Sequence, residues 1–121
     1  MTFDDVAKKL VDGCRTGKTV ENLDLLYARD AVSVEAMDNG SGREVQGLDA
    51  IKGKHDWWDN TFEMLGGDVS DPLPSGDDRF AVIFEIKVRH KESGAVSDMK
   101  EVALYTVGDG RIVREEFFYN A

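Results

Sequence analysis

Apolar residues recur at helical spacing through the first part of the chain. Four of them share one face of an amphipathic helix, at spacings of three and four: Phe3, Val6, Leu10 and Cys14. Thr2 can cap the start of this helix, and Gly17 is placed to end it through a left-handed turn. The pattern therefore predicts an N-terminal helix between these two residues.

A second short helix and a pair of strands follow. The helix begins at Thr19, and its inner face is formed by Leu23, Leu26 and Tyr27. Residues 31–37, AVSVEAM, alternate between apolar and polar positions, which predicts a strand. The turn cluster DNGSG comes next, and REVQG at 43–47 returns as a short hairpin partner.

From Leu48 the apolar period becomes helical again. Four residues spaced 4, 3 and 4 apart share one face of a third helix: Ile51, His55, Trp58 and Phe62. We expect Gly66-Gly67 to end this helix. In the segment GDVSDPLPSGDD at 67–78, the two prolines allow at most a short edge strand.

The last third of the chain is predicted to form a meander of long strands. Three strand-like runs, RFAVIFEIKVRHK, MKEVALYTV and RIVREEFFY, are separated by ESGAVSD and GDG, which suit hairpin turns. The predicted fold class is α+β: a roll in which three helices from the N-terminal half pack on a strongly curved mixed or antiparallel sheet.

Composition narrows the class of protein. A chain of 121 residues fits one domain, spanning 1–121, with a single hydrophobic core. Acidic residues outnumber basic ones by 24 to 15, giving a formal charge of −9, which argues against nucleic acid and anionic membrane as partners. The N-terminus lacks the pattern of a signal peptide, and Cys14 alone cannot form an internal disulfide. We therefore expect a cytoplasmic protein.

Three local patterns point to a known family. They are LLYARDAVSVEA at 25–36, VQGLDAIKGKHDWW at 45–58 and VGDGRIVREEFFY at 107–119. In these patterns and in the order of its elements, the chain resembles the SnoaL-like branch of the nuclear-transport-factor-two-like superfamily, which also includes ketosteroid isomerases. The resemblance implies a cone-shaped, cystatin-like roll with an apolar cavity at its wide end. Relatives include isomerases, cyclases, dehydratases and non-catalytic binding domains, so the fold alone does not give the function.

The ketosteroid isomerase site is carried over only in part. Matching the family's first-strand pattern puts Glu35 at the position of the catalytic carboxylate, and a slip of one residue would put Ala36 there. The positions of the oxyanion-hole donors fall near Val11 and Ala103, which cannot donate a proton. Without those donors, a glutamate base would lose the electrostatic stabilisation on which such sites depend.

Strand alternation gives the other candidate groups. Glu101, Ala103 and Tyr105 share one face of their strand, and Val113, Glu115, Phe117 and Tyr119 share one face of the last strand. The resemblance assigns these faces to the cavity, which implies that Glu101 and Glu115 lie among aromatic residues. The residues alone leave the choice of face open, because Val102, Leu104, Ile112 and Phe118 on the opposite faces are equally apolar.

His55 is the remaining candidate for acid–base chemistry. It shares a helix face with Trp58 and Phe62, so it is expected to point towards the sheet. Burial raises the pKa of a carboxyl group and a nearby carboxylate raises that of a histidine, so such a pair can titrate near neutral pH. The alternative is that His55 is a hydrogen-bonded packing residue.

The sequence shows no pattern for a metal or cofactor. His55 and His90 lie in unrelated elements, Cys14 lacks an activating neighbour, and GDG at 108–110 is a hairpin turn. We expect a homodimer formed through the outer sheet face, with Trp57 at the rim of the cavity or at an interface.

The sequence thus supports two kinds of function. The first is cofactor-free isomerisation, cyclisation or dehydration of a small apolar or carbonyl-containing molecule, with His55, Glu101, Glu115 and Glu35 as catalytic candidates. The aromatic residues expected to contact the ligand are Tyr27, Trp58, Phe62, Tyr105 and Phe117. The alternative is a non-catalytic ligand-binding or dimeric structural domain.

Overall fold

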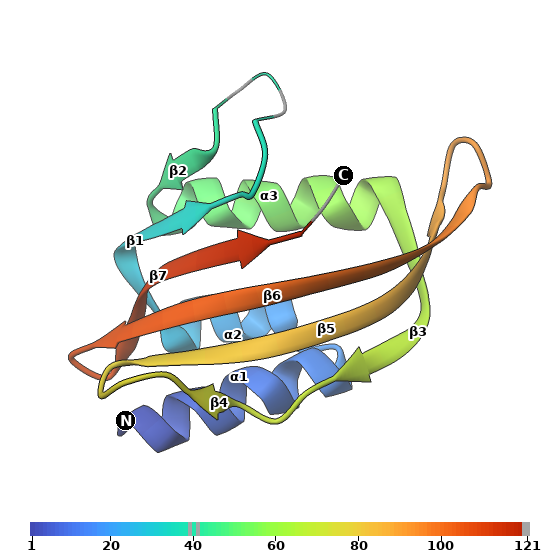
Figure 1. The fold of residues 1–121 in the computed structure, drawn as a ribbon. Coiled ribbons are helices and arrows are strands. Elements are labelled where there is room, and N and C mark those ends of the chain that lie inside the picture. The colour runs from blue at the N-terminus through green and yellow to red at the C-terminus, as the bar shows by residue number, and fades with distance from the viewer. Residues whose placement is uncertain (39, 41, 120–121) are drawn as a thin grey trace.

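The computed structural model describes residues 1–38, 40 and 42–119 of the chain. These residues form three helices, all in the first half of the chain, and seven strands, packed in one layered unit (Figure 1). The helices are α1 (Phe3–Thr16), α2 (Thr19–Leu26) and α3 (Leu48–Thr61). The strands are β1 (Tyr27–Val34), β2 (Glu44–Gln46), β3 (Phe62–Val69), β4 (Leu73–Pro74), β5 (Arg79–His90), β6 (Val96–Gly108) and β7 (Arg111–Phe118).

The strands form one open, mixed sheet in the order β2-β1-β7-β6-β5-β3, with β4 paired to β5. Strand β1 runs parallel to β7, and the other pairs are antiparallel. The helices lie against one face of this sheet, and β5 and β6 bend along their length (Figure 1). The predicted α+β architecture, with three helices on a curved mixed sheet, is therefore confirmed for the described residues.

Helix α1 has the boundaries that its sequence predicts. The Thr2 side chain accepts a hydrogen bond from the Asp5 backbone N–H, and the Asp5 carboxylate accepts one from the Thr2 N–H, which completes a capping box. Gly17 ends the helix in the left-handed conformation, with φ at 74°. The buried face carries Val6, Leu10 and Val11, so α1 contributes one wall of the core.

The end of α3 differs from the prediction. The helix stops at Thr61, and the chain continues as β3 through Gly66 and Gly67, so the prediction that this glycine pair ends the helix was wrong. Gly67 has φ at 152°, and a Cβ added to it would overlap the Glu85 carbonyl oxygen of β5. Gly67 therefore allows a close approach between two strands. Phe62, predicted on the helix face, is the first residue of β3.

Strand β1 also begins earlier than predicted. It spans Tyr27–Val34, whereas the sequence pattern indicated 31–37, and Tyr27 belongs to this strand and not to the second helix. Tyr27 is nevertheless buried, as its apolar position indicated. The segment after β3 carries only the two-residue strand β4, which agrees with the prediction of at most a short edge strand.

A bulge in β7 changes the face on which Ile112 lies. Thr106 of β6 pairs with Arg114 and Val107 pairs with Ile112, so Val113 is an extra residue on β7. An extra residue reverses the alternation of side chains on either side of it. Ile112 is consequently buried in the core together with Glu115, and its predicted place on the outer face was wrong.

The core lies between the helices and the inner face of the sheet. Phe80 of β5 is fully buried, stacks on Tyr105 and contacts Phe3 edge-on. The described residues include no helix with the length and apolar character to cross a membrane.

Candidate functional site

A buried carboxyl group lies at the centre of a polar cluster on the inner face of the sheet. Glu115 of β7 is only 2% exposed, and both of its oxygens accept hydrogen bonds. The Tyr27 hydroxyl at the start of β1 donates to Oε1, and the Ser33 hydroxyl near the end of β1 donates to Oε2 at 2.7 Å. The parallel pairing of β1 with β7 sets Ser33 opposite Glu115 and so brings these groups together.

Lys54 of α3 extends this cluster towards the solvent. Its ammonium group donates to the Ser33 Oγ at 2.7 Å and forms an ion pair with Glu35 Oε1 at 2.5 Å. The same nitrogen lies 5.3 Å from the centre of the Phe117 ring, a cation–π distance. Lys54 is therefore held from β1 and from β7 at once.

Glu35 follows directly after β1, on the same side of the chain as Ser33. Its Oε2 accepts a hydrogen bond of 2.9 Å from the Tyr119 hydroxyl, which lies just beyond β7. Desolvation and this bond to Glu35 raise the pKa of Tyr119 to about 12. The structure thus places the side chain of Glu35, and not that of Ala36, in the cluster.

Glu101 of β6 is the carboxyl group with the most unusual acidity in this region. Burial raises its pKa from the ordinary 4.5 to about 7, and the charges of Glu35 and Glu115 contribute in the same direction. Lys54 lowers the pKa, but by less than the other effects raise it. Because Glu101 is only half-buried, it combines a near-neutral pKa with access to solvent.

The inner face of the sheet is packed at one end and partly exposed at the other. Around Glu115, the inward residues Phe80, Ala103 and Tyr105 are buried. Further along the same face lie half-buried residues that surround Glu101: Phe84, Ile86, Met99 and Phe117. Apolar side chains that remain partly exposed on an inward face can contact a bound molecule.

His55 is half-buried, as its helical position indicates. Among the described residues, however, the polar contacts from α3 to the cluster come from Lys54 and not from His55. Trp58 packs against Phe62 with ring centres 4.5 Å apart, so these two predicted ligand contacts do lie together. Trp57 is 61% exposed.

The structure therefore brings four of the predicted residues into one polar cluster: Tyr27, Glu35, Glu101 and Glu115. Sequence analysis missed Lys54 and Ser33, and it placed Tyr119 on the face assigned to the cavity without naming it as a site residue. Lys54 carried a usable signal, since it lies three residues after Ile51 and four before Trp58, on the face of α3 that meets the sheet.

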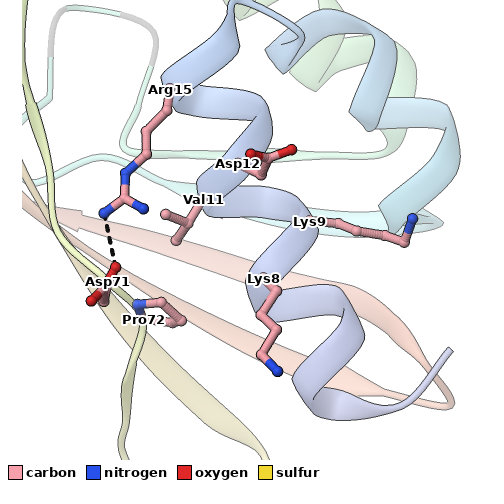
Figure 2. A pocket seen from close by; sticks show the side chains of 7 residues that line it. All are labelled: Lys8, Lys9, Val11, Asp12, Arg15, Asp71 and Pro72. Carbon is pink, nitrogen blue, oxygen red and sulfur yellow. Dashed lines mark hydrogen bonds and ion pairs between the residues drawn. The ribbon is translucent and has the colours of Figure 1, made fainter.

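Two surface depressions lie away from Glu101 and Lys54, although Tyr27 of the cluster lines one of them. One, of about 390 Å³, is lined by residues of α1 and by Asp71 and Pro72 (Figure 2). There the Arg15 guanidinium donates to the Val69 carbonyl and forms a 2.9 Å ion pair with Asp71. The other, of about 490 Å³, is lined by residues that include Arg29, Leu48 and Arg111. Neither contains Glu101 or Lys54.

The described residues form no evident metal site and contain no thiol that is activated for nucleophilic chemistry. Within them, no group of three or more histidine, cysteine or acidic side chains is placed to hold a metal ion. Burial raises the pKa of the Cys14 thiol to about 11, so the nucleophilic thiolate is not formed at neutral pH.

Comparison with known proteins places the chain among related folds. The model of the SnoaL-like domain matches residues 1–119. A SnoaL-like candidate polyketide cyclase from Mesorhizobium loti is 34% identical, with a TM-score of 0.91 over 98% of this chain and 100% of that one. No curated protein matches the chain.

More distant structures share the fold. A nuclear-transport-factor-two-like protein from Burkholderia pseudomallei is 17% identical, with a TM-score of 0.79 over 99% of this chain and 92% of that one. A protein with the ketosteroid isomerase-like fold from Catenulispora acidiphila, solved in complex with trimethylamine, is also 17% identical. Its TM-score is 0.71 over 95% of this chain and 85% of that one.

Proposed function

Because this chain belongs to the SnoaL-like domain family, we propose that it is a cofactor-independent acid–base catalyst acting on a small carbonyl-containing molecule. The reaction class is isomerisation, cyclisation or dehydration next to the carbonyl group. Such reactions begin when a base removes a proton from the carbon beside the carbonyl, which leaves negative charge on the carbonyl oxygen.

The observation that carries the proposal is the state of Glu101. A carboxyl group with a pKa of about 7 is protonated in part of the molecules and ionised in the rest at neutral pH. It can therefore both accept and return a proton near that pH, which an ordinary exposed glutamate with a pKa of 4.5 does poorly. Its half-buried position leaves it accessible to a ligand.

The neighbours of Glu101 supply the other requirements. The Lys54 ammonium is the positive group of the cluster, and it would stabilise the negative oxygen that forms when a proton is removed. The half-buried side chains of Phe84, Met99 and Phe117 would contact the apolar body of the molecule and exclude water from it. His55, one residue after Lys54 on α3, remains a candidate for a second proton carrier.

The family supports this class of chemistry. The Mesorhizobium loti relative bears the name of a candidate polyketide cyclase. Ring closure at a carbon next to a carbonyl group requires that a base remove a proton from that carbon. At 34% identity, that relative supports the reaction type for this chain more than it supports a particular substrate.

Proton exchange tests the proposal without knowledge of the natural substrate. An enone, a β-diketone and a hydroxylated quinone would each be incubated with the protein in D2O, and deuterium incorporation beside the carbonyl would be followed by NMR. We expect the protein to accelerate exchange in at least one of them, and Glu101→Gln to abolish the acceleration. His55→Ala serves as the comparison. Loss of deuterium exchange in that variant alone would indicate that the proton carrier is His55 on α3 and not Glu101.

One observation favours a second function. Within the described residues, every fully buried side-chain nitrogen or oxygen has a hydrogen-bond partner, so the buried part of the polar cluster around Glu115 does not need a ligand to satisfy it. This suits a non-catalytic binding module or a dimeric structural domain. Binding of the same three compounds without deuterium incorporation would support the binding module, and absence of both would support the structural domain.

A further inference from the structure

We propose that Ser33, itself held by Glu115, is a positioning residue that fixes the Lys54 ammonium as the counter-charge of the candidate base Glu101. The inference rests on the proposed function for the role of Glu101. The positioning of Lys54 can nevertheless be measured in the protein without any ligand, so the two can fail separately.

The direction of the hydrogen-bond chain follows from the chemistry of a hydroxyl group. Ser33 has a single O–H, which it donates to Glu115 Oε2 at 2.7 Å. Its oxygen can then only accept from Lys54, whose ammonium group lies 2.7 Å away. Ser33 is 0% exposed, so water does not compete for either bond. The chain therefore runs in one direction, from Lys54 through Ser33 to Glu115.

The far end of the chain is also fixed. The Tyr27 hydroxyl donates to the other oxygen of Glu115, which orients the carboxyl group towards Ser33. Burial beside Glu115 raises the pKa of Tyr27 well above its ordinary value, so this hydroxyl keeps its proton at any physiological pH. Glu115 is thus held in a fixed orientation in the core. Its hydrogen bond with Ser33 fixes the Ser33 hydroxyl, which in turn positions the Lys54 ammonium group.

A lysine side chain needs such an anchor to act from a defined position. Its four-carbon stem loses up to about 2 kcal/mol of conformational entropy when it is held in one place. Lys54 has contacts with Ser33 of β1, with Glu35 just after β1 and with the Phe117 ring of β7. Lys52, two residues earlier on α3, pairs among the described residues with the exposed Asp24 carboxylate alone, at 2.7 Å, and is more exposed itself.

The position of Lys54 matters because of the charges around Glu101. The titratable groups that interact with Glu101 come from four elements: Glu35 after β1, Lys54 on α3, Tyr105 on β6, and Glu115 with Tyr119 on and after β7. Among these described groups, Lys54 is the positive one. If it moved away, Glu35 and Glu115 would act on Glu101 without compensation, and Glu101 would ionise only at higher pH.

Two NMR measurements on ligand-free protein test the proposal. The first is the exchange of ammonium protons with water, measured for Lys54 and for the control Lys52 in the wild-type protein. The second is the titration midpoint of the Glu101 carboxyl carbon in the wild-type protein and in Ser33→Ala, Ser33→Thr, Lys54→Met and Lys52→Met. Amide spectra establish that each variant is folded.

We expect slower ammonium exchange at Lys54 than at Lys52. We expect Lys54→Met to raise the Glu101 midpoint by on the order of one pKa unit. Ser33→Ala should shift it in the same direction and remove the protection of Lys54, and Ser33→Thr, which keeps the hydroxyl, should restore both. Lys52→Met should leave the midpoint unchanged.

Fast exchange at Lys54 in the wild-type protein would overturn the proposal, and so would an unchanged Glu101 midpoint in folded Ser33→Ala. The exchange measurement needs no variant, so it decides the question even where Ser33→Ala does not fold. If these shifts appear and Glu101→Gln still exchanges carbonyl compounds at the wild-type rate, the proposed function fails while the positioning of Lys54 stands.

Discussion

The Lys54 ammonium on α3 lies 2.5 Å from a carboxylate oxygen of Glu35, which follows β1. Both side chains are half-buried, so their attraction is screened less than that of a surface pair. The ion pair joins the middle of a helix to the end of a strand, at the place where the inner face of the sheet becomes partly exposed. Each member also acts on the proton affinity of Glu101, and the two act with opposite sign.

Glu35→Gln should therefore lower the pKa of Glu101. The negative charge of Glu35, which lies just after β1, raises that pKa, and glutamine keeps the shape of the side chain while removing the charge. Lys54, released from its ion pair with Glu35, would also lower the pKa of Glu101 more strongly. The carboxyl-carbon titration of Glu101 measures the effect. Glu116→Gln, on the opposite face of β7, is the matched control and should leave the Glu101 midpoint in place; a higher midpoint in Glu35→Gln would contradict this account.

The same pKa predicts how stability depends on pH. The folded protein holds the Glu101 proton up to about pH 7, whereas the unfolded chain releases it near 4.5. Between these values the folded state binds more protons, so the contribution of Glu101 to the free energy of unfolding falls as the pH rises. The full difference corresponds to about 3 kcal/mol as an upper limit, which solvent reduces because the side chain is only half-buried.

Glu101→Gln, which cannot ionise, should remove this penalty. We expect the variant to match the wild-type protein in stability at pH 4.5 and to exceed it at pH 8. Denaturant unfolding at the two pH values measures the difference. Equal stability of the two proteins at pH 8 would show that Glu101 ionises at its ordinary pH in the fold.

The sequence carries enough information to predict the layers and the set of β6 residues that share one face, whereas the residues alone left open which of the two faces points inward. Thr2 and Gly17 mark α1 through local backbone chemistry, and two-residue alternation places Glu101 with Tyr105 on one side of a strand. These features depend on residues close together in the chain. For the same reason, these features could be predicted from the sequence without knowledge of how the strands pair.

The features that the sequence did not reveal depend on pairing between distant segments. The contact of Lys54 with Ser33 exists because α3 packs on β1; helical spacing indicates that Lys54 faces the sheet, but it does not indicate which residue Lys54 meets there. The bulge at Val113 is defined by the register of β7 against β6 and changes the face of Ile112. The local sequence at Gly66-Gly67 predicts the end of a helix, whereas pairing with the distant strand β5 makes both glycines part of β3.

Substitution of Gly67 tests whether this glycine lies in β3 and packs closely against β5. Its φ is 152°, and a Cβ at this position would overlap the Glu85 carbonyl oxygen, so Gly67→Ala must displace the backbone of β3 or β5. A strained backbone of this kind costs on the order of 1–3 kcal/mol. Gly66→Ala is the control, because a Cβ there meets no atom within 4 Å. Chemical denaturation should show a clear loss of stability for Gly67→Ala and little for Gly66→Ala, and equal losses would argue against the close pairing of β3 with β5.

Among the described residues, the helices cover one face of the sheet and leave the outer face uncovered (Figure 1). An apolar row runs across this outer face. Ile83 pairs with Val102, and Val102 pairs with Phe118, so three apolar side chains cross β5, β6 and β7 side by side. Phe118 is 47% exposed, which is costly for a large aromatic residue in water. We expect two copies of the chain to associate through this row.

Phe118→Asp should separate such a dimer, because it would bury two carboxylates against apolar residues across the interface. Light scattering at micromolar concentration should give the mass of a dimer for the wild-type protein and that of a monomer for the variant. Trp57→Asp is the control: Trp57 is more exposed than Phe118 but lies on α3, away from the outer face, so this variant should remain dimeric. A monomeric wild-type protein at that concentration would contradict the prediction, and dissociation by Trp57→Asp alone would place the interface on the helical side.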